Sequence, residues 1–381
     1  MNRSMSYALQ TLWHERSRYA AGVGAVAFSA VLIALQIGLL LGLFEITSIP
    51  VDHTTADIWV GSNGAPSVDI GRPIPTSLIA RLDKPGVGMP EFLYLAFAEW
   101  KKSDGTSVNC VVEGSPVNPD SAACVTEITP EIRAALAEPM TVVVDRSDMS
   151  SDRLGLAGIG SRGKINGKEV RVVGIVSGLK SLAAPWIFCC QTTARELLGV
   201  NNPKYVDHST YLLARCTTKE RAAEVVSELR SEYPEMSAYT SEEFSTKTRV
   251  YWLLRTKAGL ALGYAALLGL LVGSLITAQT LYSATMGSAK EFATLLALGI
   301  PRRKIYRMVL AQSFWVGVIG VSLAYPAVWT LSKLAEQAGT RVVLRWEILL
   351  GTAAVTLITA MIAGLFALRS VRQIEPMSLL R

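Results

Sequence analysis

The chain has 381 residues, of which 50% are hydrophobic and 18% are charged, and its formal net charge is +6. This average combines long uncharged stretches with a polar block of about two hundred residues, which excludes a single soluble globular core. The basic excess lies next to the uncharged stretches, so it indicates a membrane topology and argues against a nucleic-acid partner.

Four stretches contain no charged residue, and each provides the ~20 apolar residues that an α-helix needs to cross ~30 Å of hydrocarbon. The first is too long for the apolar region of a signal peptide and no Ala-x-Ala motif follows it, so we expect a retained anchor. The predicted transmembrane helices are 19–44, 258–289, 308–332 and 348–368.

The charge bias of the connecting segments predicts the orientation of the chain. Residues 1–18, 290–307 and 369–381 are strongly basic, whereas 333–347 is nearly balanced. The positive-inside rule therefore places both termini and the 290–307 loop in the cytoplasm, with 45–257 and 333–347 outside. Residues 1–18 also carry apolar side chains at helical spacing, which indicates either an amphipathic interfacial helix or an extension of the first transmembrane helix.

The block 45–257 alternates strand, helix and turn signals. Its Asn166-Gly167 pair is a strong hairpin signal. Overall, the chain is predicted to be a membrane α-helical protein with a large α+β extracytoplasmic domain of two lobes between the first and second helices. The expected strands are 55–61, 140–145, 172–176, 209–215 and 237–240, with a hairpin turn within 164–170 and a helix at 219–233.

All five cysteines fall in the block that we place outside, where disulfides are permitted. Cys110 and Cys124 are a possible disulfide pair, and buried free thiols are the alternative. An odd count leaves at least one thiol over. A metal site is not expected, because there is no Cys-x-x-Cys pair and the three histidines are scattered.

The sequence lacks a supported nucleotide-binding motif of either of two common kinds. Gly158–Gly163 has the letters of a dinucleotide fingerprint, but a hairpin strand is expected after it where the motif needs a helix. No phosphate-binding loop of the Gly-x-x-x-x-Gly-Lys type exists, so the chain should not hydrolyse ATP by itself. The uncharged spans also lack the ionisable residues of proton and ion relays. We therefore expect no catalytic residues, and energy must come from a partner.

Small residues recur at four-residue spacing in two of the predicted spans. Gly38 and Gly42 form one such pair, and Gly269 and Gly273 form another. Pairs of this kind let helix backbones approach closely, so these glycines are expected at helix-packing contacts.

The cytoplasmic loop between the second and third spans has an exposed apolar pattern. Phe292, Leu295 and Leu298 cluster on one face of a short helix, Gly299 suits a left-handed stop, and Pro301 suits the start of the next helix. The pattern predicts a helix that projects into the cytoplasm. The alternative is an interfacial helix beneath the lipid headgroups.

This loop resembles the coupling segment of the FtsX-like, MacB-type permease subunits of ABC transporters. The matching run is Lys290-Glu291-Phe292-Ala293-Thr294-Leu295-x-Ala297-Leu298-Gly299-x-Pro301, and the end of the chain matches the terminal Pro-x-x-x-Leu-Arg of the family. The resemblance implies that a separate ABC ATPase docks here. The implied contact residues are Glu291, Phe292, Leu295, Leu298, Gly299, Arg302 and Arg303.

Within this family, five further runs are similar to the DevC permeases. That resemblance implies a bacterial inner-membrane protein with a periplasmic adaptor (membrane fusion protein), an outer-membrane channel and a glycolipid or other amphiphile as cargo. ATP and magnesium would be bound by the partner ATPase, with no cofactor on this chain. The runs are Gln36-Ile-Gly-Leu, Ala56-Asp57-Ile-Trp, Trp100-Lys101, Val143-Val-Asp145-Arg146-Ser and Val170-Arg-Val-Val-Gly174-Ile-Val.

The predicted function is the permease subunit of an ABC exporter that works by mechanotransmission. Four helices are too few to support a cavity alone, so a homodimer is expected, packed through the first and second helices. One alternative is an FtsX-like regulatory transmitter that activates an extracytoplasmic cell-wall hydrolase. Another is a permease that releases lipoproteins from the membrane.

Overall fold

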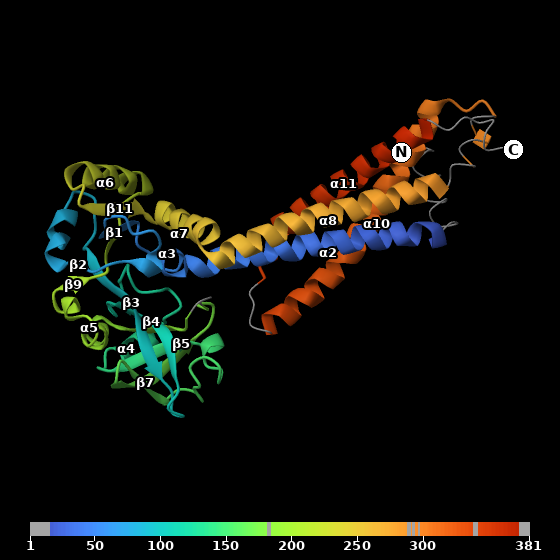
Figure 1. Cartoon of the computed structure of the whole chain (residues 1–381). Helices are drawn as coiled ribbons and strands as arrows, with labels where there is room; N and C mark the ends of the chain where they lie inside the picture. Colours follow the sequence, from blue (N-terminus) through green and yellow to red (C-terminus); the bar gives the residue numbers. More distant parts are fainter. Residues whose placement is uncertain are drawn as a thin grey trace. The chain divides into compact units, whose positions relative to one another are not determined.

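The computed structural model describes residues 16–180, 184–287, 291, 294–295, 298–337 and 342–372. These residues form two compact units (Figure 1). The membrane unit consists of residues up to Gly42 and from Lys257 onward, and the outer domain of Leu43–Thr256. The amphipathic helix predicted in 1–18 lies outside the described residues, apart from its last three.

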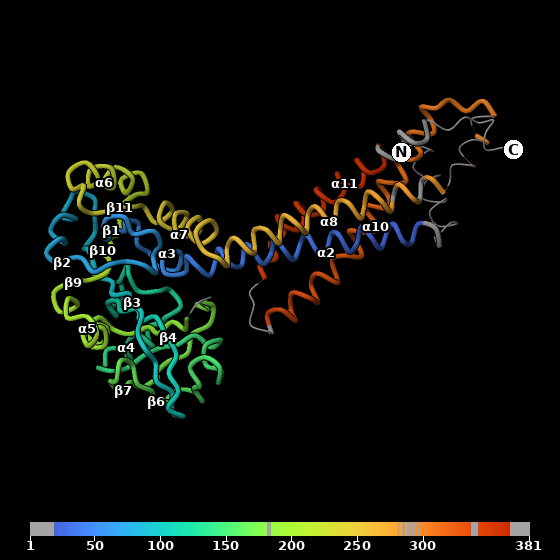
Figure 2. Tube along the Cα trace, in the orientation of Figure 1, coloured from blue at the N-terminus to red at the C-terminus, as the bar shows by residue number. Residues whose placement is uncertain are grey.

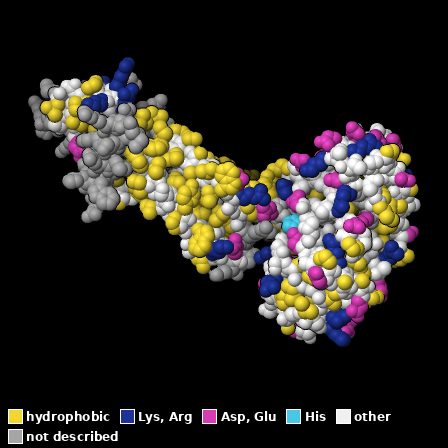
Figure 3. Space-filling model, turned by 180° about the vertical axis from the view of Figure 1, so that it is seen from behind, with side chains coloured by type: hydrophobic (Ala, Val, Ile, Leu, Met, Phe, Trp, Pro, Cys, Tyr) yellow, Lys and Arg dark blue, Asp and Glu magenta, His cyan; other side chains and the backbone are white. Residues whose placement is uncertain are grey.

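Four long apolar helices make up the described part of the membrane unit, which confirms the four predicted spans. Space-filling representation shows hydrophobic side chains over these helices, whereas charged side chains are spread over the outer domain (Figure 3). This contrast follows from the solvents that the two units meet. The helices are α2 (Arg16–Thr47), α8 (Lys257–Gly287), α10 (Arg302–Gln337) and α11 (Trp346–Arg372).

Helices α2 and α8 approach closely where α8 carries glycines. A β-carbon on Gly269 would collide with Leu32, and one on Gly273 would lie 3.2 Å from the β-carbon of Ser29. The Ser29 hydroxyl lies 2.8 Å from the carbonyl oxygen of Gly273 and 3.0 Å from the Thr277 hydroxyl. Small residues thus bring the backbones together, and buried hydroxyls link the two helices in an apolar surrounding.

The glycine pair on α2 lies in a different environment. The amide of Val343 donates to the carbonyl oxygen of Gly38 at 3.0 Å, and a β-carbon there would lie 2.8 Å from Val342 Cγ1. Gly38 therefore leaves room for the segment between α10 and α11 rather than for a helix. Gly42 is buried.

We expect Gly320→Val to destabilise the membrane unit. A β-carbon at Gly320 of α10 would lie 2.6 Å from Val26 Cγ1 and 3.1 Å from the carbonyl oxygen of Val23 on α2. Overpacking of this kind costs about 1–3 kcal/mol. Thermal unfolding of the full chain in detergent measures the change. Gly351→Val is the control, because nothing lies within 4 Å of a β-carbon there; equal shifts for both variants would contradict the packing argument.

The outer domain is built on a nine-stranded mixed sheet in the order β11-β1-β10-β3-β4-β8-β5-β7-β6. A two-stranded sheet, β2-β9, accompanies it. The strands are β1 (Ile58–Ser62), β2 (Ile74–Pro75), β3 (Glu91–Lys101), β4 (Ser107–Ser115), β5 (Thr141–Asp145), β6 (Arg162–Ile165), β7 (Lys168–Val176), β8 (Trp186–Cys190), β9 (His208–Ser209), β10 (Tyr211–Ala214) and β11 (Met236–Thr240).

Strand β3 belongs to both halves of this sheet (Figure 2). Its first residues pair with β10, its remainder pairs with β4, and its last two residues, Trp100 and Lys101, also pair with β6. The β3–β6 pairing closes β3, β4, β8, β5, β7 and β6 into a ring with Trp100 fully buried inside. The other half, with β1, β10 and β11, has its own core.

Helices cover the sheet where its side chains are apolar. Helix α6 buries Ala222, Val225, Val226 and Leu229 in the core of the β1–β10–β11 half, and its Thr218 caps the first turn through the amide of Arg221. The outer-domain helices are α3 (Ile49–Asp52), α4 (Pro130–Leu136), α5 (Gln191–Gly199), α6 (Lys219–Glu232) and α7 (Ser241–Arg255).

Most of the strands expected from the sequence are present. The hairpin at Asn166-Gly167 is confirmed, with φ values of 49° and 84° at the two turn residues. The hairpin of β3 and β4 and the strand β8 were not predicted. Their sequences do not alternate cleanly, because β4 and β8 are buried on both faces over most of their length.

The cysteines require a correction. All five are free thiols, and Cys110 and Cys124 lie in two different buried clusters. The disulfide considered between them is therefore not formed. Burial raises the pKa of the Cys110 thiol to about 12, so it acts as a small apolar core residue.

A buried carboxylic acid lies on the face of β4 that points away from the Trp100 core of the ring. Glu113 on β4 is 1% exposed, and neither of its carboxyl oxygens has a hydrogen-bond partner within the described residues. Burial raises the pKa of Glu113 to about 8, and the nearby charge of Glu127 acts in the same direction. The neutral form is therefore favoured in the folded protein over much of the neutral range.

We expect the stability of the outer domain to fall as pH rises, because of Glu113. Its pKa is about 8 when folded against 4.5 ordinarily, so its stabilising contribution is full below about pH 4.5 and is lost as pH approaches 8. Glu113→Gln should flatten this decline in thermal scans of the full chain between about pH 5 and about pH 8.5. Asp120→Asn, at an exposed loop carboxylate, is the control. If the stability of the Glu113→Gln variant declines with pH as much as that of the original chain, another group causes the decline.

Candidate functional site

The predicted coupling segment ends in a tight turn ahead of α10. The amide of Leu298 donates to the carbonyl oxygen of Thr294 at 3.0 Å, and that of Ile300 donates to Leu295 at 3.1 Å. Gly299 has a φ of 84°, which confirms the left-handed stop expected there. The carbonyl oxygen of Pro301 accepts from the amide of Lys304 at 2.8 Å, and α10 begins at Arg302.

The two leucines of this turn have different environments. Leu295 is partly buried against Ile305 and Val309 at the start of α10, both of which are 1% exposed. Leu298 is 75% exposed. Leu295 therefore holds the turn against its own chain, and Leu298 presents an apolar side chain to the surroundings.

The predicted contact residues also include three charged side chains. Glu291, Arg302 and Arg303 are exposed. Phe292 lies outside the described residues. The exposed residues at and beside the turn thus include a carboxylate, an apolar side chain and two guanidinium groups.

Helix α7 is held firmly on the outer-domain sheet. Thr240 and Glu243 form a capping box at its start, with bonds of 3.2 and 3.1 Å between each side chain and the amide of the other. One turn on, Phe244 is buried against three aromatic rings at centroid distances of 5.7, 5.6 and 5.1 Å. Those rings belong to Trp59 on β1, Tyr211 on β10 and Tyr239 on β11.

The same helix is bonded to the segment by which the chain enters the domain. Arg249 Nε donates to Ser48 Oγ at 2.9 Å, and Arg249 Nη2 lies 2.6 Å from Asp52 Oδ2. Ser48 Oγ donates to the same carboxylate oxygen at 2.5 Å. Because Ser48 directly follows α2 and α7 directly precedes α8, this Arg249 clamp ties the entry and exit of the outer domain together.

Sequence reasoning missed the Arg249 clamp. Its signal was available as a serine and an aspartate four residues apart after the first span, with an arginine shortly before the second. However, local sequence spacing does not reveal a hydrogen-bond partner that lies two hundred residues away in the chain. Only the sheet order, which places β1 beside β11, brings α3 and α7 together.

The described residues offer little to a metal or nucleotide. No group of three or more His, Cys, Asp or Glu side chains in this part of the chain is placed to hold a metal ion. Gly158 and Gly160 lie in a loop with positive φ values, and β6 follows at Arg162. No helix N-terminus is available there for a pyrophosphate, as the sequence indicated.

With this geometry, the membrane helices can be compared with known families. Residues 263–376 match the family described as FtsX-like permease C-terminal. The matched segment makes up less than one third of the 381-residue chain. It contains most of α8, the coupling turn, α10 and α11, and it does not include the outer domain.

A similar curated protein is an uncharacterized ABC transporter permease of Methanocaldococcus jannaschii, 25% identical over 227 residues. The match covers 57% of this chain and 56% of that relative, so this chain spans about half the length of the curated relative that it matches. The particular resemblance to DevC permeases stays a prediction.

Two solved structures are each similar to about half of this chain. One is the periplasmic region of MacB from Actinobacillus actinomycetemcomitans, with 11% identity, coverage of 51% of this chain and 94% of that one, and a TM-score of 0.35. The other is the extracellular domain of the noncanonic ABC-type transporter YknZ from Gram-positive bacteria, with 8% identity, 48% and 98% coverage, and a TM-score of 0.34.

We expect Arg249→Gln to loosen the base of the outer domain. Charge-assisted hydrogen bonds contribute about 1.5–3 kcal/mol, reduced here because the side chains are partly exposed. Thermal unfolding of the full chain should show a lower midpoint, and a double-mutant cycle with Asp52→Asn should give a coupling of about 1 kcal/mol. Arg255→Gln at the end of the same helix is the control. A coupling near zero would mean that the clamp does not stabilise the domain.

Proposed function

We propose that this chain is the transmembrane permease subunit of an ABC exporter that works by mechanotransmission. The observation that carries the proposal is the FtsX-like permease C-terminal match, which includes the coupling turn between α8 and α10. In this proposal the chain is not an enzyme. A separate ABC ATPase binds ATP and magnesium and docks on the turn.

The mechanical path runs along the chain from the turn. Helix α8 has 31 residues, which makes a rod of ~46 Å at the usual rise per residue. It is continuous in sequence with α7 through Thr256, and α7 is held to the sheet by Phe244 and by the Arg249 clamp. Movement imposed on the coupling turn would therefore reach a firmly attached element of the outer domain.

The proposed cargo does not cross the bilayer through a polar channel. The predicted spans contain no charged residue, so a path through one copy would have no ionisable side chain to line it. We propose instead that a glycolipid or other amphiphile is taken up outside the membrane. A periplasmic adaptor and an outer-membrane channel would complete the path, with this chain in the bacterial inner membrane and its termini in the cytoplasm.

A second copy of the chain is part of the proposal. Several apolar side chains of α8 are more than half exposed, which suits contact with lipid or with another copy. They are Tyr264, Leu267, Leu268, Leu271 and Leu275.

The exporter proposal is tested by the proteins that the tagged chain retains in mild detergent, identified by mass spectrometry. An ATPase together with a periplasmic adaptor would support export. An ATPase with a cell-wall hydrolase and no adaptor would replace export with regulation of that hydrolase. An ATPase with lipoproteins alone would indicate lipoprotein release.

We expect Leu298→Asp with Glu291→Lys to abolish docking of the ATPase. Leu298 is exposed, so its replacement leaves the chain's own packing intact, whereas Leu295 packs on α10 and would confuse the result. Co-purified ATPase and its stimulated hydrolysis should fall about tenfold or more. Ile159→Asp, at an equally exposed position of the outer domain, should change neither. Unaltered docking in the turn variant would rule out this surface.

A further inference from the structure

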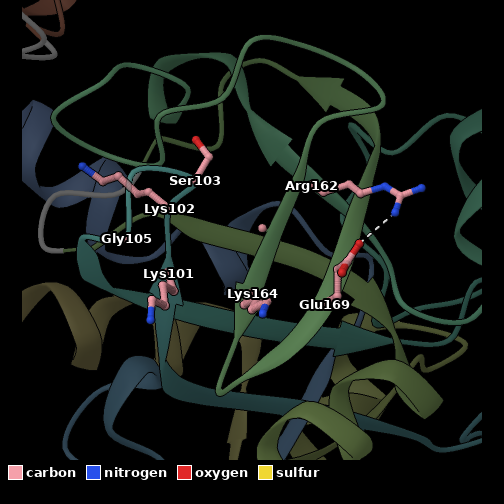
Figure 4. Close-up of a pocket in the computed structure, with 8 residues that line it drawn as sticks. Lys101, Lys102, Ser103, Gly105, Arg162, Lys164 and Glu169 are labelled. Carbon is pink, nitrogen blue, oxygen red and sulfur yellow. Dashed lines mark hydrogen bonds and ion pairs between the residues drawn. The ribbon is translucent and has the colours of Figure 1, made fainter.

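The ring of the outer domain has an open pocket of about 340 Å³ that no part of the proposed function uses (Figure 4). The end of β3, the turn after it, and the paired strands β6 and β7 line this pocket. Four of its side chains are cationic and one is a carboxylate, an excess of three positive charges. The lining residues are Lys101, Lys102, Ser103, Gly105, Arg162, Gly163, Lys164 and Glu169.

Two lysines of the pocket face each other across the strands. Lys101 on β3 is directly opposite Lys164 on β6. Like charges at directly opposite positions destabilise a sheet. Glu169 is opposite Lys164 on the other side, but its carboxylate lies 2.9 Å from Arg162 Nη1. The cost of this arrangement is offset if a multivalent anion lies between the ammonium groups.

The backbone under these side chains is rigid. Gly163 separates Arg162 from Lys164, and a β-carbon there would collide with the indole of Trp100. That indole is fully buried and donates from Nε1 to the carbonyl oxygen of Leu154 at 3.0 Å. The strand carrying two of the cations is thus fixed against a buried ring, which pre-organises the charges for a ligand.

The turn between β3 and β4 is held by hydrogen bonds. Lys102 N donates to Thr106 O at 2.8 Å, and Gly105 has a φ of 87°. The carboxylate of Asp104 accepts from the amide and the hydroxyl of Thr106 at 2.8 and 2.6 Å, and these bonds lower the pKa of Asp104. The Asp104 carboxylate is therefore hydrogen-bonded within the turn and stabilises it. Lys102 Nζ itself donates to Ser151 O at 2.7 Å, which steadies one wall of the pocket.

We propose that this pocket binds a phosphate monoester, carried either by a small molecule or by a lipid headgroup. A dianionic, tetrahedral group provides several acceptor oxygens for the ammonium groups of Lys101 and Lys164. The volume suits one such group with a short attached stem. The inference stands on the outer domain alone and does not depend on the exporter proposal.

The test measures binding to the purified full chain in detergent by isothermal titration calorimetry. The probes are glycerol 3-phosphate and dihexanoylphosphatidic acid, which share the phosphate monoester and differ in their acyl chains. The pocket variant is Lys101→Gln with Lys164→Gln. The control, Lys204→Gln with Lys219→Gln, removes the same charge at exposed positions of the same domain.

We expect at least one probe to bind the original chain and the control, and to bind the pocket variant about tenfold more weakly or worse. Similar affinity for both probes means that the phosphate monoester is sufficient for binding. Binding of dihexanoylphosphatidic acid alone means that the ligand is a lipid whose acyl chains are also required. The lipid partitions into detergent micelles to the same extent with every variant, so this partition does not affect the comparison of their affinities. Equal affinity in the pocket variant, or no binding of either probe, overturns the proposal. None of these outcomes depends on an ATPase, so they leave the exporter proposal to its own test.

Discussion

Arg249 bonds the helix that leaves the outer domain to the segment that enters it. Its guanidinium reaches Ser48 and Asp52, which directly follow the first membrane helix. The two ends of the domain are thereby attached to a common element of the fold. Here that element is the sheet edge of β1 and β11, on which α7 is fixed by Phe244. In the proposed mechanism, the clamp links motion of α8 to the rest of the domain.

Strand β3 carries that connection further into the domain. Its first residues pair with β10, in the β1–β10–β11 half of the sheet. Its last two residues pair with β6 and close the ring. This continuous strand connects the two halves of the sheet through backbone hydrogen bonds. The same closure brings Lys101 beside Lys164, so the basic pocket is a direct consequence of how the ring is completed.

Buried polar groups in the two units contribute specificity of helix pairing and sensitivity to pH. Ser29 and Thr277 join α2 to α8 through hydroxyls in an apolar surrounding, which specifies the pairing of those helices. Glu113 has no such partner among the described residues and remains neutral instead, at a pKa of about 8. The first arrangement specifies contact geometry, and the second makes the ring sensitive to pH.

The sequence by itself determined the features that depend on near neighbours in the chain. The four spans follow from local hydrophobicity, the hairpin at Asn166-Gly167 and the stop at Gly299 from backbone conformations that few residues accept. Only the tertiary structure decided the ring closure by β3 and β6, the free state of Cys110 and Cys124, the Arg249 clamp and the different roles of Leu295 and Leu298. These depend on contacts between residues far apart in the chain or on which side chains cover which, and burial is not a property of local sequence spacing.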